Sequence, residues 1–325
     1  MHSSTSSFRA LPDGWSSLLI AALFAIAALG SYEAFWRLRG FRPSLTNNEA
    51  LWCEARAKVE SDAIVLIGSS RLQLGIDPTL LGETLGGKSV VDLALEGASF
   101  VPALDDLAAD DWFHGTVVIE YMPRHWFTFD AFSRGRAQEF LRACLTSSLV
   151  GPIENRLSRH LDERLALMGP ELQLMSLLSY VAKHHYVPAS NHEVLRADRS
   201  GRLHYAERSN RSEAQFWERS LSQLALTERF DHLRNDVAAI RRRGGRIVVY
   251  RSPIQSTVLQ DEDQRFPARE WLPRLTNALP VELIDFDAWP ERDSFQFPDG
   301  EHPDDADVPR LTAILARELG RVVQY

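Results

Sequence analysis

The sequence predicts an α/β protein, a three-layer sandwich in which helices cover both faces of a parallel sheet. The order of apolar runs and helical segments predicts this fold class, and the composition predicts that the chain folds. From residue 63 to the C-terminus, short and continuously apolar runs alternate with helical segments, and such runs are typical of strands buried on both faces. The 325-residue chain is also 45% hydrophobic and 25% charged, which is close to the average for a folded globular protein.

Strands and helices alternate in the order that right-handed crossovers within one sheet require. We predict strands at residues 63–67, 89–95, 117–119, 246–250 and 281–284. We predict helices at residues 47–61, 78–85, 101–109, 230–243, 270–279 and 309–319.

The alternation stops between about residue 125 and residue 223, where the sequence becomes helical and polar. We interpret this segment as a helical insertion after the third strand. Its apolar stretch, residues 172–181, is too short to cross a bilayer. We therefore expect that stretch to pack the insertion against the main domain.

Residues 15–36 predict a transmembrane helix near the N-terminus. The stretch from Ser16 to Tyr32 carries no charge, and aromatic residues stand at both ends of the segment 15–36, where they suit the two membrane interfaces. At ~1.5 Å per residue the helix is about 30 Å long, enough to cross a bilayer. A cleaved signal peptide is the alternative, but its apolar core is usually shorter. We therefore predict a cytoplasmic tail at residues 1–14, a membrane anchor at residues 15–36 and an α/β domain at residues 47–325.

The net charge of −8 and the scattered basic residues argue against a nucleic-acid partner, because phosphate binding needs an excess of Lys and Arg. Only two cysteines are present, Cys53 and Cys144, without CxxC or Cys/His spacing. Neither a zinc site nor a disulfide scaffold is indicated. One bridge between them remains open, but we favour two small buried residues.

The residues that follow each predicted strand are the candidates for a site, because ligands bind beyond the carboxyl ends of the strands in an open parallel sheet. The first four strands are followed by Gly68-Ser69-Ser70-Arg71, Glu96-Gly97-Ala98, Glu120-Tyr121-Met122-Pro123-Arg124 and Arg251-Ser252-Pro253. A long acidic loop after the fifth strand contains Asp299 and His302.

Three of these residues suit acyl transfer. Ser70 stands at a strand-to-helix turn, where its hydroxyl is exposed and nearby backbone N–H groups can hold an oxyanion. The serine needs a base, and His302 follows Asp299 by three residues. That spacing lets the carboxylate orient the imidazole while the other ring nitrogen faces the serine. The sequence therefore predicts a triad of Ser70, His302 and Asp299.

These motifs resemble those of the SGNH (GDSL-like) hydrolases. The GSS tripeptide at residues 68–70 is similar to the family's GDS block with Ser in place of Asp, and Asp299 and His302 are similar to its DxxH block. Gly97 is similar to the glycine block that follows the second strand. The resemblance implies a flavodoxin-like sandwich of the SGNH hydrolase type.

The resemblance also implies roles for individual residues and no cofactor. Ser70 would be the nucleophile, His302 the general base and Asp299 the residue that orients it. The backbone N–H groups of Ser70 and Gly97 would form the oxyanion hole, and Ser69 would be structural.

A GSS variant behind an N-terminal anchor resembles SGNH-like proteins of bacterial envelopes. Such a protein would be an esterase or O-acyltransferase acting on an acylated polysaccharide or another envelope glycopolymer, with a membrane acyltransferase as a candidate partner. Its domain would lie outside the inner membrane. Arg37, Arg39 and Arg42 follow the helix, and the positive-inside rule alone would place the domain in the cytoplasm. We predict the orientation that the resemblance implies, with the domain outside the inner membrane.

One block departs from the family. The asparagine that completes the family's oxyanion hole after the third strand is missing, because the chain at this point reads Glu120-Tyr121-Met122-Pro123-Arg124. Losing one such donor typically costs about 100-fold or more in rate. Either another donor such as Arg124 replaces it, or the protein is a catalytically silent binding or scaffold subunit of a polysaccharide-modifying complex.

Two further interpretations concern the charged residues at the strand tips. Arg71, Arg124 and Arg251 follow three different strands and would converge on an anionic substrate. Alternatively, they neutralise neighbouring carboxylates in a structural ion-pair network. A divalent metal could also bind the acidic loop, but we favour the triad. The candidate ligands would be Asp299, Glu301, His302, Asp304 and Asp305.

Overall fold

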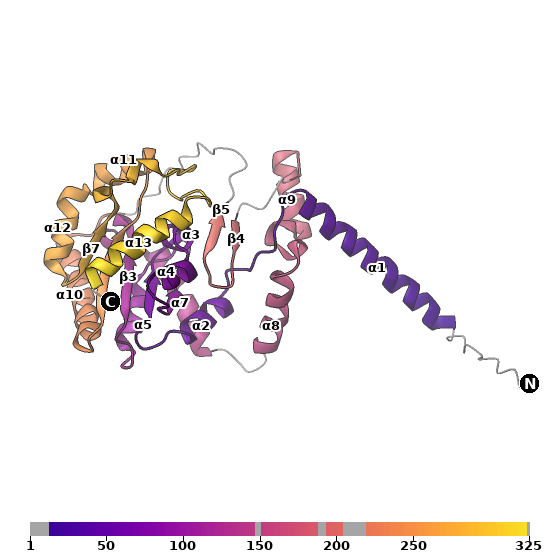
Figure 1. Cartoon of the computed structure of the whole chain (residues 1–325), viewed down its shortest axis with the longest axis horizontal. Helices are drawn as coiled ribbons and strands as arrows, with labels where there is room; N and C mark the ends of the chain where they lie inside the picture. The colour runs from indigo at the N-terminus through magenta and orange to yellow at the C-terminus, as the bar shows by residue number, and fades with distance from the viewer. Residues whose placement is uncertain (1–12, 147–150, 188–192, 204–218, 324–325) are drawn as a thin grey trace, which may run out of the picture.

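Five parallel strands form the central sheet, in the order β2–β1–β3–β6–β7. The computed structural model describes residues 13–146, 151–187, 193–203 and 219–323 (Figure 1). Numbered along the chain, the strand order is 2-1-3-4-5, the flavodoxin-like order. The strands are β1 (Ile64–Ile67), β2 (Val90–Asp92), β3 (Thr116–Glu120), β6 (Arg246–Arg251) and β7 (Glu282–Asp285). All five predicted strands are therefore confirmed, with ends that differ by at most three residues.

Helices cover both faces of this sheet, which confirms the three-layer sandwich. Successive strand residues point to opposite faces, so Val65 and Ile67 belong to one buried cluster and Ile64 and Leu66 to the other. The first cluster is covered by α2 (Glu49–Ala57), α5 (Val101–Ala109), α7 (Ala131–Thr146), α10 (Gln223–Arg242) and α12 (Ala268–Ala278). The second is covered by α3 (Ser70–Gly75), α4 (Pro78–Thr84) and α13 (Val308–Val323).

The segment predicted as a helical insertion contains more than helices. It includes α6 (Pro123–Phe127), α7, α8 (Gly151–Asp162), η1 (Ala166–Met168), η2 (Pro170–Leu172) and α9 (Leu174–His184). It also contains an antiparallel pair of strands, β4 (Glu193–Leu195) and β5 (Gly201–Leu203). These strands were not predicted, because a strand of three residues is too short to show a periodic pattern.

The apolar stretch 172–181 does not pack on the main domain as predicted. Leu172 and the partly buried Leu177 pack instead against Trp36, Phe41 and Ala166, at the end of the N-terminal helix. None of the residues of α9 is buried. The prediction was wrong because hydrophobicity shows that a stretch needs a partner, but not which partner it finds.

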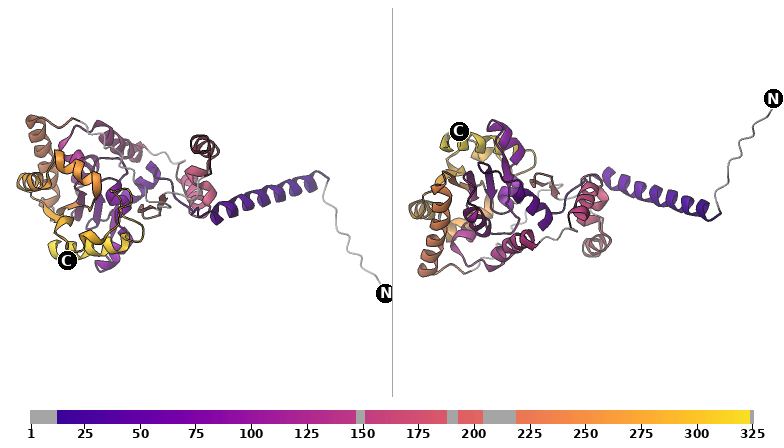
Figure 2. Two further views of the ribbon diagram at one scale, coloured as in Figure 1. Left: turned by 90° about the horizontal axis from the view of Figure 1, so that it is seen from above. Right: turned by 90° about the horizontal axis from the view of Figure 1, so that it is seen from below.

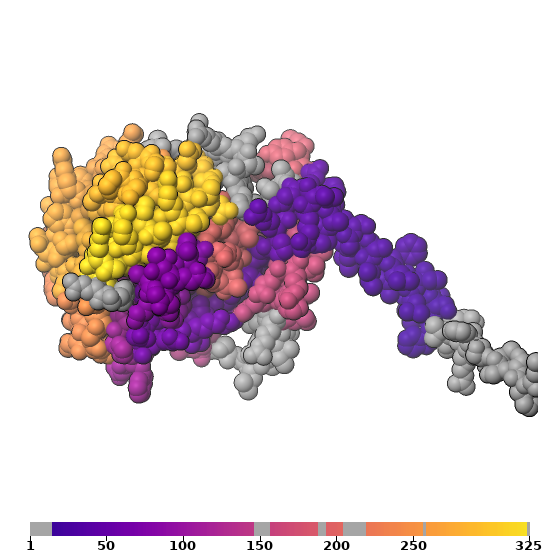
Figure 3. All heavy atoms as spheres, viewed as in Figure 1, coloured from indigo at the N-terminus to yellow at the C-terminus, as the bar shows by residue number. Residues whose placement is uncertain are grey.

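The N-terminal helix α1 (Asp13–Leu38) projects from the rest of the chain (Figures 2 and 3). It is long and apolar enough to cross a membrane, and no part of its apolar window is buried by the protein. The predicted tail falls mostly on residues 1–12, which lie outside the described residues.

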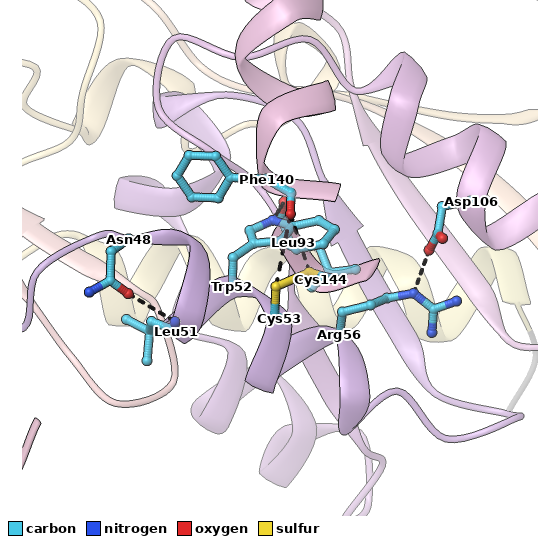
Figure 4. The surroundings of a disulfide bond; sticks show 9 residues. All are labelled: Asn48, Leu51, Trp52, Cys53, Arg56, Leu93, Asp106, Phe140 and Cys144. Atoms are coloured by element: carbon cyan, nitrogen blue, oxygen red, sulfur yellow. Dashed lines mark hydrogen bonds and ion pairs between the residues drawn. A yellow bond between two sulfur atoms is a disulfide. The ribbon is translucent and has the colours of Figure 1, made fainter. Parts of the chain in front are cut away.

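The two cysteines form a disulfide, so the preference for two unpaired residues was wrong. Cys53 on α2 and Cys144 on α7 have their Cα atoms 5.3 Å apart although 91 positions separate them in sequence (Figure 4). The two helices lie side by side because Trp52 and Phe140 bury their rings in the same cluster. The packing of α2 against α7 therefore determines that the two cysteines pair, and the local sequence around each cysteine does not predict it.

Candidate active site

Gly68 and Ser69 form the turn that leads from β1 into α3. A Cβ atom at Gly68 would lie 2.5 Å from the Cβ of Glu120 on β3, so only glycine allows the two strand ends to approach this closely. Ser69 is the N-cap of α3, and Ser70 is its first residue. Ser70 therefore stands between β1 and β3, where the strand order reverses and ligands of this fold class bind.

The buried side chain of Glu120 holds this turn in place. Its carboxylate accepts hydrogen bonds from the backbone N–H of Ser69 and from the Ser69 hydroxyl, the latter at 3.0 Å. Burial raises the pKa of Glu120, although the charge of Arg71 opposes the shift. These contacts are consistent with the structural role that the resemblance implies for Ser69.

The structure brings Ser70, His302 and Asp299 together in one chain of hydrogen bonds. The Ser70 Oγ lies 2.8 Å from His302 Nε2, and His302 Nδ1 lies 2.8 Å from Asp299 Oδ2. In the tautomer that donates from Nδ1 to the carboxylate, Nε2 accepts the proton of the serine hydroxyl. The second oxygen of Asp299 accepts the backbone N–H groups of Glu301 and His302 at 2.9 and 2.8 Å, so the carboxylate is held on both sides.

Neighbouring carboxylates decide the protonation behaviour of His302. Burial alone would lower the pKa of the imidazole. The hydrogen bond to Asp299 and the negative charges of Glu301 and Asp299 outweigh that effect, so the pKa lies above its ordinary value of 6.5. The imidazole is therefore suited to hold a proton taken from the serine.

Arg71 occupies the centre of a buried ion-pair network next to the candidate triad. Its guanidinium contacts Glu262 at 2.6 Å and Glu301 at 2.8 Å, and its side chain is almost fully buried. Burial alone would lower the pKa of Arg71, but the charges of Glu262 and Glu301 raise it above the ordinary value. Glu262 lies on α11 (Ser256–Arg265), a helix that was not predicted, and no sequence signal marked it as part of the site.

The other two arginines also have carboxylate partners. Arg251 contacts Asp285 at 3.2 Å and also pairs with Asp287. Arg124, with 26% of its side chain exposed, lies 3.4 Å from Asp130. The ion-pair alternative thus describes Arg71 and Arg251 well. A cavity of about 710 Å³ lies beside Arg251, but no residue of the triad lines it.

Gln73 ties the loop of Gly97 to the helix that begins at Ser70. Gly97 has a φ of +64°, which favours glycine. The preceding Glu96 donates its backbone N–H to the Gln73 side chain at 3.0 Å, and Gln73 also donates to the carbonyl of Arg199 at 3.2 Å. Sequence reasoning missed Gln73, although a polar residue one helical turn after Ser70 is a usable signal.

The acidic loop contacts protein groups at each position considered as a metal ligand. Glu301 pairs with Arg71, and Asp305 lies 3.2 Å from Arg202. Asp304 accepts the backbone N–H of Ala306 at 3.0 Å. These contacts favour an interpretation in which the loop supports the triad.

Comparison with known proteins finds remote similarity in structure alone. No protein-family model matches the sequence, and no curated protein matches it. The similar solved structures include protein YxiM from Bacillus subtilis (13% identity, TM-score 0.36), a carbohydrate esterase family 2 enzyme with a carbohydrate-binding domain from Corynascus thermopiles (11%, 0.37) and a family two carbohydrate esterase from Clostridium thermocellum in complex with cellohexaose (12%, 0.34). The matches cover 81%, 82% and 82% of this chain but 57%, 68% and 66% of those proteins.

We predict that Asp299→Asn lowers the pKa of His302, because the imidazole loses the charge-assisted hydrogen bond to this carboxylate while its burial and the charge of Glu301 remain. The imidazole of the unmodified protein should titrate above 6.5. NMR titration of the His302 ring resonances measures both values. Asp293→Asn, at an exposed position in the short 3-10 helix η4 (Arg292–Ser294), is the control and should leave the pKa of His302 unchanged. An unchanged pKa in the Asp299 variant would contradict the electrostatic interpretation.

Proposed function

We propose that this chain is a membrane-anchored serine esterase or O-acyltransferase of the SGNH hydrolase type, acting on an acylated polysaccharide or another envelope glycopolymer. The observation that carries the proposal is the hydrogen-bonded chain from Ser70 through His302 to Asp299, with two contacts of 2.8 Å. The resemblance of the GSS and DxxH motifs to that family supplies the substrate class.

The proposed reaction follows from the positions of these groups. His302 Nε2 accepts the hydroxyl proton of Ser70 while Oγ attacks the ester carbonyl. Asp299 stabilises the imidazolium that forms. The backbone N–H groups of Ser70 and Gly97 are the proposed donors to the oxyanion. His302 then protonates the departing alcohol, and water or a sugar hydroxyl attacks the acyl-enzyme in the second half of the reaction.

The second candidate is a catalytically silent binding or scaffold subunit. It is favoured by the tip of β3, where Glu120 bonds to Ser69 and the family's asparagine is missing. It is opposed by the intact triad geometry, since a binding subunit has no need of an imidazole aligned between a serine and a carboxylate. Kinetic measurements on triad variants decide between the two candidates.

The anchor and the disulfide support a location outside the cytoplasm. We propose that α1 crosses the inner membrane once and that the α/β domain is periplasmic or extracellular. Disulfides persist in oxidising compartments and are rare in the cytosol, and Cys53 is bonded to Cys144. This observation favours the outer side despite the three arginines that follow α1.

Ser70→Ala and His302→Ala should each lower the turnover rate by at least about 10⁴-fold, because each removes one partner of the proton transfer. Asp299→Asn should cause an equal or smaller loss. The measurement is steady-state hydrolysis of a small ester, with circular dichroism to confirm the fold. Ser252→Ala, a serine at the tip of β6, is the matched control. Full activity in the Ser70 or His302 variant would contradict the triad.

Arg124→Gln should raise the KM for an acidic polymer by about tenfold, equivalent to ~1.4 kcal/mol, and leave the KM for a neutral ester unchanged. Arg124 is the most exposed of the three arginines at the strand tips. Arg251→Gln is the comparison, and it should lower the free energy of unfolding by about 1.5–3 kcal/mol through lost hydrogen bonds to carboxylates. Equal losses on both substrates for Arg124→Gln would show that this arginine does not bind the polymer.

Protease added to intact spheroplasts should digest the α/β domain, because we place that domain outside the membrane. A cytosolic protein in the same sample should stay protected. Alkylation under denaturing conditions should label Cys53 and Cys144 only after reduction. Protection of the domain until the membrane is permeabilised would refute the proposed orientation.

A further inference from the structure

Helix α9 presents an apolar surface that the described part of the chain does not cover. Leu174, Met175 and Leu178 are 70%, 72% and 54% exposed, and Val181 is also exposed. Leu174, Leu178 and Val181 follow the spacing of a single helical face. A soluble surface seldom carries several large apolar side chains side by side, so this face needs an occupant.

One flank of α9, next to its exposed apolar face, packs against the base of α1. Leu177 packs against a buried cluster that includes Trp36 of α1, Phe41 and Leu172. Figure 1 shows α9 beside the end of α1, between that helix and the α/β domain. Figure 3 shows the end of α1 in contact with this part of the chain. The exposed face of α9 is thus held next to the point where α1 leaves the rest of the protein.

The contacts of α1 show at which depth of the bilayer α9 and the segment before it would lie. From Trp15 to Tyr32 the helix is about 27 Å long at ~1.5 Å per residue, close to the thickness of the hydrocarbon core. The next residue, Glu33, accepts the backbone N–H groups of Ala166 and Leu167, each at 2.9 Å. The segment that leads into α9 therefore lies where the hydrocarbon core ends.

The polar groups around α9 suit the lipid headgroup region. Arg37 and Arg39 are exposed at the end of α1, and Lys183 is exposed in the last turn of α9. Tyr180 and Tyr186 pack ring to ring beside that turn, with centroids 5.8 Å apart. Tyrosines and basic residues that flank an apolar helical face are typical of helices that lie in a membrane interface.

We propose that α9 is an interfacial helix whose apolar face inserts into the outer leaflet of the bilayer that α1 crosses. The inference rests on the proposed anchoring by α1 and adds a second, independent membrane contact. An anchor with one point of attachment leaves its domain free to tilt. Two contacts joined by the Trp36 cluster would hold the α/β domain, and with it the candidate triad at Ser70, at a fixed height and orientation above the lipid.

The test uses the full-length protein in nanodiscs that contain anionic phospholipid. A single cysteine is introduced by Leu178→Cys and labelled with a nitroxide without reductant, so that the Cys53–Cys144 bond stays closed. Electron paramagnetic resonance then compares collisions with oxygen, which enters lipid, and with a water-soluble nickel chelate. Leu224→Cys on α10 is the matched control because that leucine is 71% exposed on the α/β domain. Ile26→Cys in α1 reports on the anchor.

We expect the label at position 178 to lie about 5–10 Å below the headgroup boundary, the label at 26 deeper, and the label at 224 in water. A label at 178 as accessible to nickel as the label at 224, with position 26 buried in lipid, would overturn the interfacial helix and leave the anchor intact. Exposure of position 26 to water would overturn both. Protection of position 178 from both reagents, with dipolar broadening between copies, would identify a second chain as the occupant and also overturn the proposal.

Discussion

The candidate site depends on one buried positive charge. Arg71 follows Ser70 directly, and its guanidinium pairs with Glu262 on α11 and Glu301 in the acidic loop. An uncompensated buried charge costs several kcal/mol, so the fold is stable only when both carboxylates reach this point. Their arrival brings the loop that carries His302 to the helix that carries Ser70. The same carboxylate, Glu301, contributes to the raised pKa of the histidine, so one network both positions the imidazole and raises its pKa.

The fold could be predicted from local patterns because buried parallel strands and their crossover helices leave strong local signals. Residues 101–109 were predicted as a helix and form α5 (Val101–Ala109). The candidate triad could be predicted for a related reason: the carboxyl ends of parallel strands lie at one edge of the sheet, which puts the turn that carries Ser70 and the loop that carries His302 on the same side of the molecule. The partners of buried groups could not be predicted. The contacts of Glu262 and Gln73 and the disulfide between Cys53 and Cys144 depend on which elements pack together in the folded chain. The spacing of residues in the local sequence does not predict that packing.

The three arginines show where sequence reasoning reaches its limit. Position alone placed Arg71, Arg124 and Arg251 at the sheet edge but could not separate substrate binding from structural pairing. The structure gives each one a carboxylate partner, and exposure then distinguishes Arg124 from the buried pair. The N-terminal region follows similar logic. Hydropathy predicted that α1 and the stretch at 172–181 each need an apolar environment, and the contacts around Trp36 join these two segments.

The proposed activity rests on a Ser70 hydroxyl that behaves as a nucleophile, and a serine-directed phosphonate tests that property without knowledge of the natural substrate. The purified full-length protein is treated with the reagent, and the modified peptide is identified by mass spectrometry. We expect a covalent adduct on Ser70 that forms far more slowly in a His302→Ala variant, because the imidazole removes the proton. A folded protein that stays unmodified, or one that is modified at another serine with equal ease, would contradict the proposed function.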